Sequence, residues 1–240
     1  MNIARLFRTS WRDIQASRRQ DAAYREIWNA FAYYPEVADG RHDTESWTAE
    51  AGPFAICVIR VPAKVLKPSL DEIRESLTTY DFVRLHPDHF LHITLQELGF
   101  VTDLPQRTDE ITPDRLEEFV NGASSALTGA IPFDLRLGGA NSFQDAAFLD
   151  VHDRGQCSRI HTRMRELAAV PSQPKYAYVP HSTIAQYATE CAAPGLTEAM
   201  SNWRDRRFGS FTVHEIEVVT IDLHEPYPEL KTIGVIPLVG

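Results

Sequence analysis

The chain is poor in cysteine and contains no long apolar run, and both features narrow its function. Its three cysteines, Cys57, Cys157 and Cys191, are widely spaced, and no Cys-x-x-Cys pair occurs. This pattern indicates neither a disulfide framework nor a cysteine zinc site, and it fits a reducing cytoplasm. No apolar segment is long enough to span a membrane, and the N-terminus lacks the apolar core of a secretory signal. We therefore expect a cytoplasmic protein that does not bind membranes.

An excess of basic residues is also missing. The 240 residues include 24 lysines and arginines against 33 aspartates and glutamates, which gives a formal net charge of −9. Proteins that follow long nucleic acids neutralise many phosphates with basic side chains. The composition therefore argues against such a partner, but it is compatible with a small phosphorylated ligand held by a few groups.

The common motifs of nucleophilic catalysis and of phosphate-binding loops are absent as well. No Gly-x-Ser-x-Gly elbow and no Gly-x4-Gly-Lys-Ser/Thr loop occurs. None of the three cysteines lies in a motif that marks a nucleophile, so inert thiols are expected. Any catalysis must therefore use other groups.

Hydrophobic periodicity divides the chain into a helical extension at residues 1–50 and a larger domain at residues 51–240. Apolar residues at spacings of three and four predict a helix from Ser10 to Phe31, and a polar loop follows it. In the larger domain we expect helices at 69–80, 112–127, 158–169 and 194–206, and strands at 54–61, 90–98, 132–137, 146–151, 176–187, 211–223 and 232–239.

Local signals refine two of the expected helices and the fold class. Ser69 and Glu72 have the spacing of a capping box, and Pro113 suits the first turn of a helix. Neighbouring strands in this order of elements need not be parallel. The sequence thus predicts an α+β fold with mainly antiparallel sheets.

Two short segments of the larger domain resemble each other. Leu91-His92-Ile93-Thr94-Leu95 and Pro180-His181-Ser182-Thr183-Ile184 both contain His-x-Thr followed by Leu or Ile, with the histidines 89 residues apart. The tripeptide alone is a weak signal, since a third copy at residues 42–44 falls in the polar loop and is followed by a glutamate. The apolar residue after each threonine distinguishes the two copies that lie in predicted strands.

Strand geometry places each histidine beside its threonine. Residues i and i+2 of a strand point to the same face, so His92 shares a face with Thr94, and His181 shares one with Thr183. By the same alternation Gln96 would share the face of His92, which makes it a candidate substrate contact. If the two strands lie side by side, two imidazoles and two hydroxyls converge on one site.

Such a set of groups suits acid–base chemistry at a phosphate. Imidazole titrates near neutral pH, so one ring can accept a proton from water while the other donates a proton to the leaving oxygen. Threonine hydroxyls can donate hydrogen bonds to phosphoryl oxygens as charge redistributes. This chemistry requires neither a metal nor another cofactor.

The blocks around both motifs resemble the 2H phosphoesterase superfamily, in particular its 2′,3′-cyclic phosphodiesterases, a group also described as 2′-5′ RNA ligases. Residues 92–99, HITLQELG, resemble the family block H-h-T-L-x-F-L-G, and residues 180–185, PHSTIA, resemble P-H-h-T-[IL]-A. Further similarity at 132–139, 148–151, 227–230 and 236–238 extends the resemblance over residues 54–238. It implies a two-lobed fold with a central cleft, in which the two histidines and two threonines are the catalytic residues.

The chain differs from the family pattern at three positions. Glu97 replaces an aromatic residue, Ser182 replaces an apolar one, and Gln186 replaces an arginine that many members carry. These differences leave the four residues of the motifs unchanged. They do bear on whether the chain accepts the RNA-end substrate that is usual for the family.

A metal site is the competing interpretation of one segment. His86, His89 and His92 are spaced as His-x2-His-x2-His, and neutral imidazoles can bind zinc. Pro87 argues against a helix there, and in a strand His89 points away from the other two. We therefore expect no metal at these histidines.

The expected function is metal-independent hydrolysis of a 2′,3′-cyclic phosphate, free or at an RNA end, by a monomer. The resemblance implies opening to a 2′-phosphate. We favour His181 as the base and His92 as the acid, and the reverse assignment stays open. Alternatives are hydrolysis of another cyclic nucleotide or a 2′-5′ oligonucleotide, RNA end ligation, and nucleotide binding without turnover.

Overall fold

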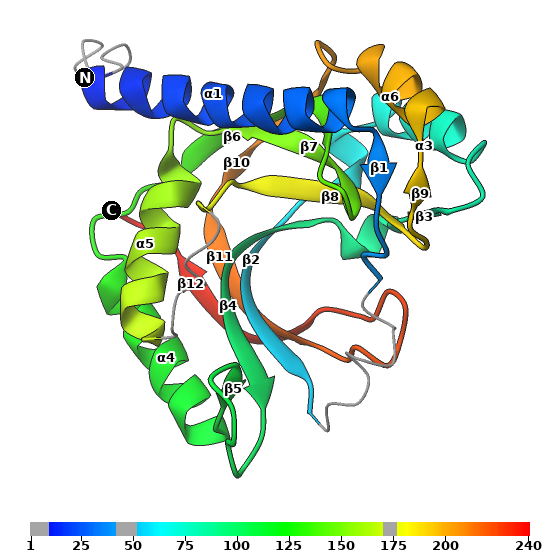
Figure 1. Cartoon of the computed structure of the whole chain (residues 1–240). Coiled ribbons are helices and arrows are strands. Elements are labelled where there is room, and N and C mark those ends of the chain that lie inside the picture. The colour runs from blue at the N-terminus through cyan, green and yellow to red at the C-terminus, as the bar shows by residue number, and fades with distance from the viewer. Residues whose placement is uncertain (1–9, 42–51, 170–176) are drawn as a thin grey trace.

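The protein is an α+β structure built on two five-stranded sheets (Figure 1). The computed structural model describes residues 10–41, 52–169 and 177–240. Within these ranges five α-helices occur: α1 Trp11–Tyr33, α3 Ser69–Leu77, α4 Pro113–Ala126, α5 Gln156–Ala168 and α6 Pro194–Ser201. None of the described helices is long and apolar enough to cross a lipid bilayer.

The sheet that carries the second motif has the strand order β10-β6-β7-β8-β3. Its strands are β3 Val83–Leu85, β6 Phe133–Ser142, β7 Ala146–His152, β8 His181–Tyr187 and β10 Arg207–Val213. All four pairings in this sheet are antiparallel. We call it the His181 sheet.

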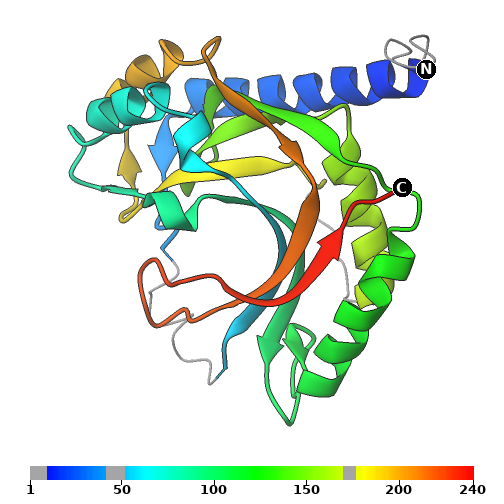
Figure 2. The same ribbon diagram turned by 180° about the vertical axis from the view of Figure 1, so that it is seen from behind.

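The sheet that carries the first motif has the strand order β12-β11-β2-β4-β5. Its strands are β2 Phe54–Arg60, β4 His92–Val101, β5 Glu110–Ile111, β11 Glu215–Ile221 and β12 Lys231–Pro237. Only the short pairing of β4 with β5 is parallel. We call it the His92 sheet. Helices α4 and α5 pack beside it, where α4 contacts β12 (red in Figure 2) and α5 contacts β4.

The two sheets meet at their motif strands. β8 pairs with β3 only at Ala185 and Tyr187 and the residue between them, and β4 pairs with β5 only at Phe100 and Val101. The first half of each motif strand therefore has a paired neighbour on one side only. At this margin β4 and β8 contact each other, although they belong to different sheets.

One continuous core lies beneath both sheets. Alternate residues of β4, such as Ile93 and Leu95, and of β7, such as Leu149 and Val151, join the buried apolar faces of all four helices from α3 to α6. A smaller apolar cluster covers the other face of the His92 sheet and includes Ile56, Val58, Phe90, Phe100 and Val219. Strand alternation thus gives the His92 sheet one large buried face and a second face that is buried only in part.

Replacing Ile93 by alanine should destabilise the protein strongly. Ile93 is 0% exposed and lies between the two motif residues of β4. Loss of a large aliphatic side chain from a closed core costs about 2–5 kcal/mol. Ile233 on β12 is 43% exposed and is the matched control, so Ile233→Ala should change the free energy of unfolding far less. Urea titration of both variants measures the difference; equal losses would contradict this description of the core.

Most predicted elements are confirmed, and the helix starts show why the details differ. Helix α4 begins as expected, with Pro113 in its first turn and the Thr112 hydroxyl accepting a hydrogen bond from the Arg115 amide. The capping box at α3 is wrong, because Pro68 occupies the N-cap and has no side-chain acceptor. The Ser69 hydroxyl and the Glu72 carboxylate instead accept hydrogen bonds from Arg206.

Three element boundaries also differ from expectation. The strand expected at 211–223 is two strands, β10 and β11, which separate at His214 and enter different sheets. β6 continues through the expected turn at Gly138-Gly139, because a bulge and the positive φ of Gly139 (82°) absorb the irregularity. The strand expected from residue 176 begins at His181: residues 177–180 belong to no strand, and residue 176 lies outside the described ranges.

Helix α1 packs on the His181 sheet. A capping box between Ser10 and Asp13 starts it, and its contacts are with β6, β7 and α6. Only Gln20, Tyr24 and Phe31 are buried, so a narrow stripe fixes the helix to the sheet. After the helix, β1 Glu36–Val37 pairs with β9 Cys191–Ala192.

Candidate active site

The first motif presents His92 and Thr94 on one face of β4. Directly opposed residues of an antiparallel pair share a face. His92 is opposite Arg60 and Thr94 is opposite Val58 on β2, two positions apart. Both motif side chains are partly exposed, whereas Ile93 is buried on the core face.

A β-bulge immediately after Thr94 changes the alternation of β4. Val58 pairs with Thr94 but Cys57 pairs with Gln96, so Leu95 is an extra residue in β4. Gln96 therefore shares the core face with Cys57. The expectation that Gln96 shares the face of His92 is wrong for this reason. Gln96 is 8% exposed, and its amide nitrogen donates to the Glu97 carbonyl at 2.6 Å.

The same bulge brings Glu97 to the face of the motif. Glu97 is opposite Ile56, which alternates with Val58, the partner of Thr94. The side chain stays accessible to water, yet the protein around it desolvates the carboxylate and raises its pKa. A protonatable carboxyl group thus stands beside the motif, at the position where the family pattern has an aromatic ring.

The second motif is likewise followed by a β-bulge, on β8. His181 is opposite Asp150 and Thr183 is opposite Phe148, so the motif side chains share a face. Ile184 is an extra residue, and Gln186 consequently pairs with Ala146 on that same face. Glu97 and Gln186 therefore occupy equivalent positions, each five residues after its histidine.

Both histidine rings are fixed through the same nitrogen. His92 Nδ1 lies 2.7 Å from the Phe90 carbonyl oxygen, and His181 Nδ1 lies 2.9 Å from the Val179 carbonyl oxygen. A carbonyl oxygen only accepts, so Nδ1 carries the proton in each ring. In each neutral ring the lone pair is therefore on Nε2.

Aromatic side chains surround His181. The rings of Phe143 and Phe148 lie 5.1 and 5.3 Å from its centroid. Burial disfavours the charged imidazole and lowers the pKa of His181, against smaller opposing effects of the Val179 carbonyl and of Asp145. His181 is therefore neutral at pH 7, with an unprotonated Nε2. Beside His92 the ring of Phe90 lies at 5.3 Å.

Two aromatic residues tie the segment before β8 to β4. The Tyr178 hydroxyl donates to the Thr94 carbonyl at 2.9 Å. His161 of α5 stacks on Tyr178 at 4.0 Å and bonds through Nδ1 to the Leu95 carbonyl. Sequence reasoning did not single out either residue, because a link between segments 84 residues apart leaves no periodic signal.

The other candidate residues do not join this arrangement. The His-Asp-Thr copy at residues 42–44 lies outside the described ranges. His89 bonds to the Tyr227 carbonyl, and the buried His86 packs edge-on against Phe90. Among the residues that the structure describes, no three His, Cys, Asp or Glu side chains converge as metal ligands. Cys57 and Cys157 are buried, and burial raises the pKa of both thiols, to about 12 for Cys57.

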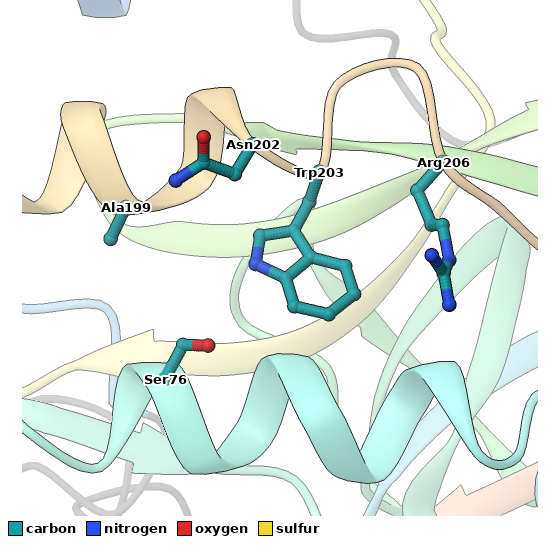
Figure 3. Close-up of a pocket in the computed structure, with 5 residues that line it drawn as sticks. All are labelled: Ser76, Ala199, Asn202, Trp203 and Arg206. Atoms are coloured by element: carbon teal, nitrogen blue, oxygen red, sulfur yellow. The ribbon is translucent and has the colours of Figure 1, made fainter.

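Two cavities lie away from both motifs. One of about 330 Å³ is lined by residues of α3, α6 and the turn after α6: Ser76, Ala199, Asn202, Trp203 and Arg206 (Figure 3). Another of about 270 Å³ lies between α1 and the His181 sheet and includes Arg136, His152 and Arg204. None of the four motif residues lines either cavity.

A family model matches the part of the chain that contains both motif strands. Residues 61–225 match the model of the 2′-5′ RNA ligase superfamily, which covers both motifs and more than half of the chain. The chain belongs to this superfamily. Membership in the 2′-5′ RNA ligase superfamily associates the chain with phosphoester chemistry. Helix α1 lies outside the matched residues.

Solved structures share the fold at low sequence identity. TT0787 of Thermus thermophilus is 19% identical with a TM-score of 0.58, and the match covers 78% of this chain and 98% of that one. Apo LigT of Escherichia coli is 16% identical with a TM-score of 0.54, and the match covers 79% of this chain and all of LigT. LigT complexed with 3′-AMP is 16% identical with a TM-score of 0.55, and the match covers 78% of this chain and 99% of that one. No curated protein matches the chain.

Proposed function

We propose that this protein hydrolyses a 2′,3′-cyclic phosphate, on a nucleoside or at an RNA end, to a 2′-phosphate without a metal ion. One observation supports this most: two His-Thr pairs stand on strands that contact each other, and both histidines are held by a carbonyl at Nδ1. The two rings, held in the same way, would serve as the two proton carriers. Chemistry at a phosphodiester needs one to accept a proton and one to donate it.

The two histidines divide these roles by environment. His181 is neutral because burial lowers its pKa, so its Nε2 accepts the proton of the attacking water. His92 keeps its Nδ1 proton on the Phe90 carbonyl, and in its protonated form the additional proton resides on Nε2. That proton passes to the 3′ oxygen as its bond to phosphorus breaks. Thr94 and Thr183 donate hydrogen bonds to the phosphoryl oxygens.

Ligands of a structural relative support a small phosphorylated substrate. LigT of Escherichia coli has been crystallised with 3′-AMP, with phosphate and with ATP. Each ligand carries a phosphoryl group of the kind that two imidazoles and two hydroxyls can bind. We extend this substrate class to the present chain, acting as a monomer in a reducing cytoplasm.

A panel of phosphodiesters tests the substrate. Purified protein is incubated in EDTA with 2′,3′-cyclic AMP, 3′,5′-cyclic AMP, a 2′-5′ oligoadenylate and an RNA end pair suited to ligation. We expect turnover of the 2′,3′-cyclic nucleotide and formation of the 2′-phosphate. Turnover of another member alone would replace the proposed substrate. Binding of 2′,3′-cyclic AMP in calorimetry without any product would instead indicate a nucleotide-binding module.

The pH dependence tests the role of His181. Protonation of His181 removes the base, so kcat/KM should fall as the pH decreases. Because the pKa of His181 is lowered, the midpoint of this acidic limb should lie below the usual histidine pKa of about 6.5. Phe143→Ala removes a ring that desolvates the imidazole, so the midpoint of this limb should move to higher pH. Phe211→Ala on β10 serves as the control. A limb that stays in place in Phe143→Ala, or moves equally in both variants, would contradict the assignment.

A further inference from the structure

Helix α1 reaches the start of the second motif strand through a single buried tyrosine. Tyr24 is 1% exposed, and its hydroxyl oxygen lies 2.6 Å from the Pro180 carbonyl oxygen. The same oxygen lies 2.9 Å from the Val151 carbonyl and 3.0 Å from the Val151 amide. Figure 1 shows α1 lying over β6 and β7, two of the strands that it contacts.

The tyrosine occupies a gap in the sheet. Pairing of β7 with β8 ends at Asp150 and His181, so Val151 and Pro180 are the first residues beyond the ladder. Backbone groups at such an end need other partners when they are buried. The Tyr24 hydroxyl accepts from the Val151 amide and offers its proton to a carbonyl, and thus takes the place of a further ladder position.

The Tyr24 hydroxyl stays protonated, and a second hydrogen bond fixes the same turn of α1. Burial raises the pKa of Tyr24 well above its usual range, so the hydroxyl keeps its proton at all relevant pH values. It has one proton, and the Pro180 oxygen is the nearer acceptor. The Tyr24 backbone carbonyl also accepts from the Asn141 side chain at 3.0 Å, which fixes this turn of α1 to β6.

The bond to Pro180 completes a series of anchors that leads to His181. The Tyr178 hydroxyl bonds to the Thr94 carbonyl, the Val179 carbonyl accepts from the His181 ring, and the Pro180 carbonyl accepts from Tyr24. Three consecutive residues before His181 are each held by a different partner. Small displacements of a proton carrier reduce catalysis steeply, so these anchors matter for the rate.

We propose that Tyr24 is a positioning residue for His181, which makes the helix outside the family match part of the catalytic unit. Tyr24 acts through the Pro180 peptide and does not touch the substrate. This inference rests on the proposed function for its kinetic readout only, because the state of the His181 ring can be observed without turnover.

The test uses Tyr24→Phe, which keeps the ring and removes the hydroxyl. We expect kcat for 2′,3′-cyclic AMP to fall about tenfold with KM within twofold, as a misplaced base affects the transition state more than binding. NMR of ring-labelled histidine should show a shifted titration of His181, identified by comparison with His181→Ala. Both measurements are made on the full chain below the unfolding transition of each variant.

Two variants on the same helix separate positioning from loss of stability. Tyr33→Phe removes the same hydroxyl where the residue is 79% exposed. Gln20→Leu removes the buried hydrogen bond from Gln20 to Asp153 and loosens α1 without touching Pro180. Both should keep the wild-type kcat and the wild-type His181 titration. The proposal is overturned if Tyr24→Phe equals the wild type in both kcat and the His181 titration. It is also overturned if Gln20→Leu causes the same changes as Tyr24→Phe. An inactive wild type refutes the proposed function, while the His181 titration still decides this inference.

Discussion

Replacing either His92 or His181 by alanine should reduce kcat for a 2′,3′-cyclic nucleotide by about 1,000-fold. General acid or base catalysis by one positioned side chain contributes about 10²–10⁴ to a rate, and the proposed mechanism gives each ring one of these roles. The two losses should be similar in size, because the rings share the same carbonyl anchor at Nδ1. Steady-state rates in EDTA, measured with protein whose fold is verified by circular dichroism, provide the comparison.

The control and the double variant sharpen this expectation. His214 is exposed in the short segment between β10 and β11, so His214→Ala should retain the wild-type rate. The double variant His92→Ala/His181→Ala should lose little more than either single variant, because residues that act as a unit are not additive. A single histidine variant within tenfold of wild type would remove that residue from the mechanism.

The second large effect should come from the threonines. Thr94→Val and Thr183→Val keep the shape and strand preference of the side chain but remove its hydroxyl. Loss of one preorganised donor to a developing oxyanion costs about 10²–10³ in kcat, and we expect a loss of about 100-fold for each. The measurement is kcat for 2′,3′-cyclic AMP at saturating substrate.

Serine variants at the same positions provide the rescue. Thr94→Ser and Thr183→Ser retain the hydroxyl and lose only a methyl group, so they should recover most of the rate. If valine and serine cause equal losses, packing of the methyl group decides the effect and the hydroxyls do not bind phosphate. If valine causes no loss, the threonines have no role in catalysis.

The sequence was sufficient for the motif strands and their general placement. Alternation of His92 and Thr94 with Ile93 and Leu95 predicted one polar and one buried face, and β4 has both. The same reasoning succeeded for β8. These features are local, because side-chain direction in a regular strand depends on the residue number alone.

The bulges could not be predicted by that reasoning. Whether Leu95 or Ile184 is an extra residue depends on the register with β2 and β7, and register is a property of two strands together. A one-residue insertion reverses the faces, which is why Gln96 faces the core and Glu97 stands beside the motif. Two-residue strands such as β1 and β9 are likewise too short to show a period.

The role of α1 illustrates a second limit. The periodic pattern predicted the helix of the extension, but it carried no information on which strands the helix contacts. Tyr24 and Pro180 are 156 residues apart, and no spacing rule relates them. Only the folded chain shows that a residue of the extension bonds to the peptide that precedes His181.

Metal-free opening of a 2′,3′-cyclic phosphate by the His92–His181 pair is the central claim, and one measurement tests it directly. Wild-type protein and the His92→Ala/His181→Ala variant are incubated with 2′,3′-cyclic AMP in EDTA, and the products are followed by ³¹P NMR. The wild type should convert the substrate to 2′-AMP, and the double variant should leave it unchanged over the same time. Conversion that requires an added metal ion, or that proceeds equally in the double variant, would contradict the claim.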